Sequence, residues 1–179
     1  MLQTTLAQSS GAAPAKLQSP LTAETHPPGD IPDSQAFVEY RSPLGFSIKV
    51  PEGWARREQS NDVSFNDKYN RVQVAVSSQP SAPTVAGVKA KQIVAMGKSP
   101  EAIHIASVTQ VALQAGAAIV VHYGANSDVN SVTNKAIRLD NASYYFWKEG
   151  KLAVLTLSTP AGADNVDQWQ LMAKSFAWR

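Results

Sequence analysis

The sequence predicts an α+β fold, an α/β/α sandwich with a mainly antiparallel sheet, preceded by a disordered N-terminal tail. Three observations support this prediction. Short segments of alternating apolar and polar residues recur along the chain, most of them are joined by turn-length connections, and two segments place apolar residues at helical spacing. A chain of 179 residues, 44% of them hydrophobic, is long enough for one domain with its own core.

The predicted tail spans residues 1–35 and the predicted domain residues 36–179. The tail has no aromatic residue and holds five of the eleven prolines, among many Ala, Ser, Thr and Gln residues. Such a segment has too little apolar surface to offset the entropy it would lose on ordering. We therefore expect a flexible, partly extended tail that acts as a tether. A segment that folds onto a partner is the alternative.

The first half of the domain predicts two pairs of strands and a helix. In each pair, alternating side chains flank a turn or short loop rich in Gly, Asn, Asp, Ser or Pro. The strands are residues 37–40, 46–50, 63–65 and 72–76. The helix follows near residues 84–96, with Thr84 as its N-cap and Gly97 just past its end.

The second half predicts further strands and a terminal helix. The strands are residues 103–114 and 117–123, joined at Ala115-Gly116, then 135–139, 144–147 and 152–157, the last two joined at Glu149-Gly150. The helix lies near residues 164–176, capped by Asp164. Its apolar stripe consists of Val166, Trp169, Met172, Ala173 and Phe176.

Composition and missing motifs exclude several classes of function. The formal net charge is only +2 and no basic run is interleaved with aromatics, so we predict no nucleic-acid partner. The absence of cysteine excludes disulfides, thiol catalysis and zinc-thiolate sites. There is no Gly-x-Ser-x-Gly elbow and no phosphate loop. No apolar stretch approaches the roughly 20 residues of a membrane helix.

The start of the domain carries a recognisable pattern. An aromatic strand and a turn lead to Gly-aromatic, an alternating strand and then Pro-x-x-Trp. The matching residues are Phe37, Tyr40, Gly45, Phe46, Pro51 and Trp54. This pattern resembles the PsbP-like family, named for an extrinsic subunit of photosystem II, which shares its fold with a Ran-binding nuclear-import factor and with bacterial secreted lipoproteins. The resemblance covers roughly residues 36–179.

The resemblance implies an α/β/α sandwich, an extracytoplasmic location in association with a membrane, and a role as an accessory or binding subunit. It implies no catalytic residues and no cofactor, so none are assigned. Residues 1–10 lack the basic start and apolar run of a complete signal peptide, and we expect that a leader was trimmed. A link to photosynthesis rests on analogy with the family alone.

Two groups of residues are candidate metal ligands. His26 lies in the tail, and His104 and His122 lie on neighbouring predicted strands. If Ala115-Gly116 is a two-residue turn, His122 faces Thr109 and lies roughly 16–17 Å from His104 along the strand, too far to share a metal. A second group could converge on a hard cation from one loop, although turn residues of a hairpin explain it more simply. Its members are Asp62, Asn66, Asp67 and Asn70.

An aromatic run, Tyr144-Tyr145-Phe146-Trp147, is the most distinctive feature of the second half. Alternation sends Tyr145 and Trp147 to one face of the strand and Tyr144 and Phe146 to the other. In a sheet covered on both faces all four belong to the core, which is the favoured interpretation. The alternative is that one face is partly open and these four residues form a contact surface or a small-ligand pocket.

Three hypotheses for function follow. The first is a non-catalytic accessory subunit, tethered to or assembled on a membrane protein complex or another protein partner. The second is a protein that binds a small ligand or lipid in an aromatic pocket beside residues 144–147. The third and weakest is a metal-dependent enzyme that uses His122 with nearby carboxylates.

Overall fold

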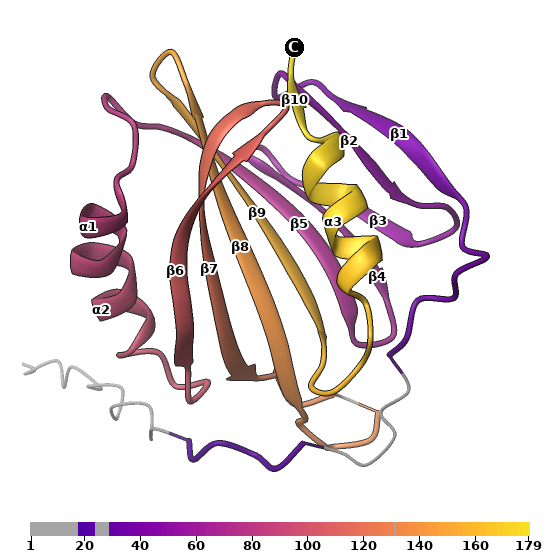
Figure 1. The fold of residues 1–179 in the computed structure, drawn as a ribbon. Helices are drawn as coiled ribbons and strands as arrows, with labels where there is room; N and C mark the ends of the chain where they lie inside the picture. Colours follow the sequence, from indigo (N-terminus) through magenta and orange to yellow (C-terminus); the bar gives the residue numbers. More distant parts are fainter. Residues whose placement is uncertain (1–17, 24–28, 131) are drawn as a thin grey trace, which may run out of the picture.

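The computed structural model describes residues 18–23, 29–130 and 132–179 (Figure 1). The strands in this part of the chain are β1 (Phe37–Ser42), β2 (Phe46–Pro51), β3 (Ala55–Glu58), β4 (Asp62–Asp67), β5 (Asn70–Ser78), β6 (His104–Leu113), β7 (Gly116–Asn126), β8 (Arg138–Lys148), β9 (Lys151–Pro160) and β10 (Ala177–Trp178). The helical segments are α1 (Val85–Val88), a π-helical turn (Lys89–Ile93), α2 (Val94–Met96) and α3 (Val166–Ser175).

Seven strands form one antiparallel sheet in the order β3-β4-β5-β9-β8-β7-β6, and β1-β2-β10 form a second, smaller one. The predicted α+β class with a mainly antiparallel sheet is therefore confirmed. The predicted hairpin at Glu149-Gly150 is also present, with Lys148 paired to Lys151 and positive φ at both turn residues.

The large sheet is covered on both faces (Figure 1). On one face lie α3 and the small sheet, and on the other lies the helical segment of residues 85–96. Each face has its own apolar cluster, and alternation along β8 divides the strand between them: Phe146 belongs to the first cluster and Tyr145 to the second.

Stacked rings join the large sheet to α3 and the small sheet. Phe146 on β8 stacks on Phe176 after α3, with ring centroids 4.2 Å apart, and Phe176 stacks on Phe46 of β2 at 5.5 Å. All three side chains are fully buried. These three stacked rings fix the position of α3 over one half of the sheet. The helix therefore does not cover β6 and part of β7 (Figure 1).

The predicted helix near residues 84–96 is present as one helical segment. The Thr84 hydroxyl accepts a hydrogen bond from the backbone N–H of Gly87, as expected of an N-cap. A π-helical turn interrupts it at residues 89–93. Only Val88 in α1 is fully buried, against Ile119, Val121 and Tyr145.

The start of α3 differs from the prediction. The N-cap is Asn165, not Asp164, and Val166 is 60% exposed and so lies outside the apolar stripe. Asn165 makes no capping hydrogen bond to its own helix, because its side chain is engaged elsewhere. The backbone N–H of Ile31 donates to its Oδ1 at 2.6 Å, and its Nδ2 donates to the carbonyl of Gly29 at 2.9 Å.

Residues 29–33, which we call the strap, therefore lie against the domain although they belong to the predicted tail. Asn70 Nδ2 also donates to the Gly29 carbonyl at 2.9 Å, and Gln168 Nε2 donates to the Ile31 carbonyl at 3.2 Å. Ile31 is buried. The side-chain amides of Asn70, Asn165 and Gln168 thus hold the strap by hydrogen bonds, which the composition of the strap itself does not predict. The part of the chain that packs against the domain therefore begins before residue 36.

Residues 18–21 also contact the domain. The backbone N–H of Leu21 donates to Asn126 Oδ1 at 3.0 Å, and Asn126 Nδ2 donates to the Ser19 carbonyl at 2.8 Å. Residues 1–17 and 24–28, the rest of the predicted tail with His26, lie outside the described residues. The tether role of the tail stays a prediction.

Candidate functional site

The four aromatic residues of the predicted contact surface are mostly buried. Tyr144, Tyr145 and Phe146 are 9%, 6% and 1% exposed, and Trp147 is half-buried. The Trp147 indole N–H donates to the carbonyl of Gln79 at 2.8 Å. This burial agrees with the interpretation that the aromatic rings belong to the core. Tyr145 and Trp147 border a small hollow of about 150 Å³, and Tyr144 borders a larger one on the opposite face.

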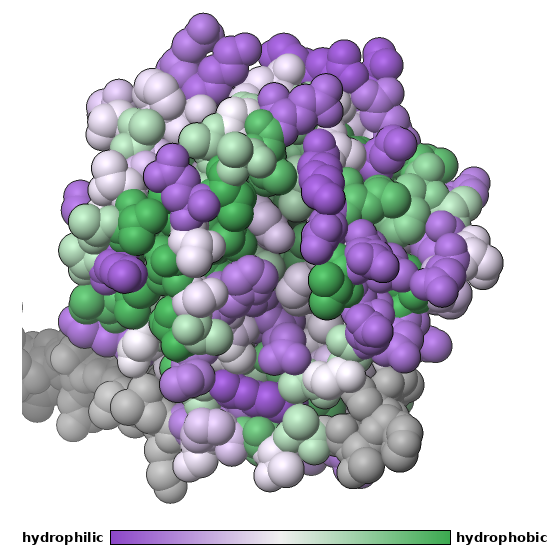
Figure 2. Space-filling model, viewed as in Figure 1, coloured by the Kyte–Doolittle hydropathy of each residue, from purple (hydrophilic) through white to green (hydrophobic). Residues whose placement is uncertain are grey.

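The larger hollow lies between α3 and the part of the sheet that α3 leaves uncovered. It encloses about 270 Å³. Its lining comes from alternate residues of β6, β7 and β8 and from α3: Thr109, Val111, Leu113, Val120, His122, Tyr144, Gln170, Ala173 and Lys174. In the view of Figure 2, hydrophobic residues gather over β6 and β7 beside hydrophilic residues of α3.

Cross-strand pairing aligns these residues on one face. Thr109 pairs with Val120, which in turn pairs with Tyr144, and Val111 pairs with Ala118. A strand sends every second side chain to the same face, so these positions together form the floor of the hollow. Ala173 of α3 packs in the same apolar cluster and forms the wall.

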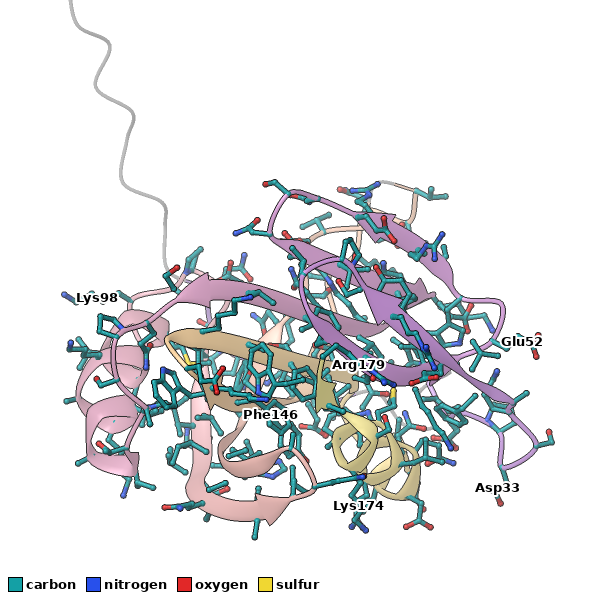
Figure 3. The ribbon with its side chains drawn as sticks, turned by 90° about the horizontal axis from the view of Figure 1, so that it is seen from above. Asp33, Glu52, Lys98, Phe146, Lys174 and Arg179 are labelled. Carbon is teal, nitrogen blue, oxygen red and sulfur yellow. The ribbon has the colours of Figure 1, made fainter. Side chains whose placement is uncertain are left out.

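A second, more open hollow of about 490 Å³ continues along α3. It is bordered by Glu39, Ser47, Lys49, Gln114, Leu171, Lys174, Ser175, Ala177 and Arg179. Lys174 borders both hollows, and Gln114 directly follows Leu113. We treat the two as one surface, the α3 groove, with an apolar inner end at Tyr144 and a charged outer end at Arg179. Figure 3 shows Lys174 projecting from α3 and Arg179 near the helix end.

Three cations and one carboxylate border the outer end. Glu39 accepts hydrogen bonds from Arg41 and Arg179, and the Arg41 guanidinium is the largest cause that lowers the pKa of this exposed carboxyl. Lys174 Nζ donates to Gln170 Oε1 at 3.1 Å. Among the described residues, neither Lys49 nor Lys174 forms an ion pair. The outer end is therefore positively charged.

His122 and Tyr144 are the polar groups of the inner end that burial affects most. Burial lowers the pKa of His122 below 6.5 and raises the pKa of Tyr144 above 10.0. Both shifts favour the neutral form of the side chain. Within the described part of the chain, neither the imidazole of His122 nor the hydroxyl of Tyr144 has a hydrogen-bond partner, so both can donate to or accept from a bound molecule.

The structure brings His104 and His122 closer together than the sequence predicted. The turn between β6 and β7 is Gln114-Ala115 rather than Ala115-Gly116, and a bulge interrupts β6 between Ile105 and Ser107. His122 consequently pairs with Ser107 and not with Thr109. His104 pairs with Gly124, two positions further along β7. The predicted separation of His122 from His104 along the strand was therefore too long.

The acidic loop does not converge either. Asp62 and Asp67 lie at opposite ends of β4, and the Asn70 side chain points to the strap and donates to Gly29. Across residues 18–23, 29–130 and 132–179, no three His, Cys, Asp or Glu side chains lie close enough together to hold one metal ion. None of the helices in these ranges has the length and apolar composition that a membrane crossing requires.

Sequence reasoning singled out Tyr144 and, as a metal ligand, His122, but it missed the other residues of the α3 groove. Thr109 and His122 were the available signal, because each is a polar residue in line with apolar residues of its own strand. Their meaning depends on where α3 crosses the sheet. That position is set by the contacts between Phe146, Phe176 and Phe46, which link residues far apart in the sequence.

Solved structures share this fold over most of their length. Cyanobacterial PsbP from Synechocystis aligns with 85% of this chain and 99% of its own, at 15% identity and a TM-score of 0.59. The Ran-binding protein Mog1p from Saccharomyces cerevisiae aligns with 81% of this chain and 96% of its own, at 10% identity and a TM-score of 0.53. A protein of unknown function from Pseudomonas aeruginosa aligns with 80% of this chain and 97% of its own, at 13% identity and a TM-score of 0.52.

The chain thus has the PsbP-like fold that the pattern at residues 37–54 predicted. Identities of 10–15% establish the fold and not a shared activity. No protein-family model and no curated protein sequence matches the chain.

Proposed function

We propose that the chain is a non-catalytic binding subunit that assembles on a membrane protein complex at the extracytoplasmic side of a membrane. The observation that carries the proposal is the α3 groove, an open surface with an apolar inner end and a charged outer end. A groove of this kind suits recognition of another protein, in which apolar contacts supply area and charges fix orientation. The fold supports the same class of role, since Mog1p with this fold is a Ran-binding protein.

The test is affinity capture from membranes of the natural source, solubilised in mild detergent. The tagged full-length chain is expected to elute with a membrane protein complex, and a chain lacking residues 1–17 is expected to be retained less if the tail is the tether. This deletion keeps residues 18–21 and the strap, which contact the domain. If the full-length chain elutes alone from every membrane fraction, the accessory-subunit proposal is wrong.

A small-ligand role is the second candidate, and the inner end of the groove favours it. Tyr144 and His122 offer polar groups there that have no hydrogen-bond partner among the described residues, beside an apolar floor. The volume of about 270 Å³ lies just below the roughly 300–1,000 Å³ typical of ligand pockets, and the hollow opens into the outer end. A ligand would remain partly exposed, so we rank this role second. Native mass spectrometry of the purified chain tests it through the mass of any retained ligand.

A metal-dependent enzyme built on His122 receives the least support. The other residues that border its hollow are apolar or neutral, apart from Lys174. An ammonium group beside the imidazole disfavours a bound cation by charge repulsion. Metal analysis of the purified chain tests this possibility directly.

A further inference from the structure

The α3 groove combines two kinds of surface in a fixed order. On the β6 side, its inner part runs from Thr109 to Leu113, five residues that span about 13 Å along the strand. Gln114 and then the cationic outer end follow. A bound chain in extended conformation would therefore cover this floor with about five residues before it reaches the outer end.

The charges at the outer end determine what kind of chain fits. Glu39 is already held by Arg41 and Arg179, whereas Lys49 and Lys174 form no ion pair within the described residues. Both lysines are exposed, so their ammonium groups are hydrated and accessible. Carboxylates that arrive at this end would meet uncompensated positive charge, and basic residues would be repelled.

The polar groups of the inner end suit a peptide main chain. The imidazole of His122 and the hydroxyls of Tyr144 and Thr109 border an otherwise apolar surface. Within the described part of the chain they have no hydrogen-bond partner, so they are available to amide N–H and C=O groups. Val111, Leu113 and Val120 offer apolar contact between them.

We propose that the α3 groove binds an extended acidic segment of a partner protein, with apolar side chains over β6 and β7 and carboxylates at Lys49 and Lys174. The proposal deepens the proposed function and rests on it, because it names the surface and the chemistry of the partner. Charge complementarity together with the apolar floor favours this occupant over a membrane surface, since the cations border a groove lined by Val111, Leu113 and Val120.

The experiment is selection of a random peptide library against the immobilised full-length chain. Peptides that combine apolar residues with Asp or Glu are expected to be enriched. They should bind the variant K49E/K174E at least about tenfold more weakly than the unaltered chain. The matched control is K89E/K91E, which makes the same change of net charge in the helical segment on the opposite face of the sheet. It is expected to bind the peptides as the unaltered chain does.

Two further measurements locate and challenge the binding. In heteronuclear NMR spectra, the best peptide is expected to shift the backbone amides of residues 109–113, 120–122 and 170–175. Thermal unfolding checks that both lysine variants are folded. Enrichment without acidic bias, equal loss in both variants, or shifts confined to another face would each overturn the proposal. So would stronger binding to anionic phospholipid vesicles than to any peptide, if K49E/K174E abolished it.

The peptide experiment and the capture experiment can fail separately. If the chain assembles on a membrane complex but the selected peptides ignore the α3 groove, this inference is wrong and the proposed function stands. If peptides bind the groove but no membrane complex is captured, the occupant is an acidic protein segment elsewhere and the accessory-subunit role is wrong.

Discussion

At the scale of single residues, His122 shows how burial changes a property that the sequence suggests. An unburied histidine is partly charged near neutral pH. Here the side chain borders the inner end of the α3 groove, and burial lowers its pKa below 6.5. The imidazole is therefore neutral over most of the physiological range, which suits a hydrogen-bonding role better than an electrostatic one.

The lowered pKa predicts a pH-dependent stability. The unfolded chain binds a proton on His122 near pH 6.5, whereas the folded chain does so only at lower pH. The free energy of unfolding therefore falls as the pH falls from about 6.5 to the folded pKa, and His122 has no such effect above that window. We expect H122Q to lose less stability than the unaltered chain between about pH 8 and pH 5 in urea unfolding.

The comparison contains its own control. Above the window the imidazole is neutral in both states, so the two proteins should show the same pH dependence there. The effect is expected to be modest, because His122 keeps much of its surface exposed and the burial that lowers its pKa is incomplete. Parallel pH profiles for the two proteins throughout the acid range would show that His122 is not desolvated in the folded chain.

The aromatic run illustrates what residue patterns alone can predict. Alternation correctly divided Tyr144 and Phe146 from Tyr145 and Trp147, because a strand leaves no other arrangement. It could not say that Tyr144 borders a hollow while Phe146 stacks under Phe176 at 4.2 Å. That difference depends on where α3 ends, which is a property of the tertiary structure.

At the scale of elements, alternation predicted the strands that bury one or both faces and missed those that bury neither. All four residues of β3 are exposed, and they pair with β4 through the backbone. Residues 138–148 form one strand, where the sequence predicted segments at 135–139 and 144–147. Asn141 falls between these segments and is buried, because its side chain accepts a hydrogen bond from Ser158 on β9.

The strap is the element-scale feature that composition concealed. Its anchor is Asn165 at the start of α3, which is 2% exposed and bonds to both Ile31 and Gly29. Asn70 also donates a hydrogen bond to the Gly29 carbonyl, so that carbonyl keeps a partner without Asn165. The Ile31 N–H, in contrast, donates to Asn165. A buried donor without a partner costs about 1–3 kcal/mol.

We therefore expect N165A to lower the free energy of unfolding by about 2 kcal/mol and to speed hydrogen exchange at the Ile31 amide. Urea unfolding and exchange measured by NMR check the two effects. V166A is the matched control, since Val166 is the next residue and is 60% exposed; it should change stability by less than about 0.5 kcal/mol. Unchanged protection of Ile31 in N165A would show that the strap is held by other contacts.

At the scale of the whole molecule, the two faces of the large sheet are covered unequally. The face toward α3 and the small sheet carries the larger cluster, with the stacked rings of Phe146, Phe176 and Phe46. The opposite face is covered by residues 85–96, where Val88 is the fully buried hydrophobic side chain and Val94 is 53% exposed. The second layer is thus attached by much less apolar area.

This inequality explains why the fold class could be predicted while the site could not. A sheet with apolar residues on both faces needs two covering layers. The spacing of apolar residues along the strands shows that both faces are apolar, so the sequence predicts the two layers. The width of each layer is not encoded in periodicity. The α3 groove exists because α3 and the small sheet are too narrow to cover β6 and β7 (Figure 1).

The same inequality predicts that the molecule opens in a set order. Because residues 85–96 bury little apolar surface, and a π-helical turn interrupts their hydrogen bonding, this segment is expected to open without global unfolding. Native-state hydrogen exchange should give a lower opening free energy for its amides than for those of β8 and β9 at the centre of the sheet. V88A should lower the opening free energy of the helical segment further. Exchange of the β8 and β9 amides should still require global unfolding. Equal opening free energies for the helical segment and the central strands would mean that both layers unfold with the sheet as one cooperative unit, in spite of their unequal burial.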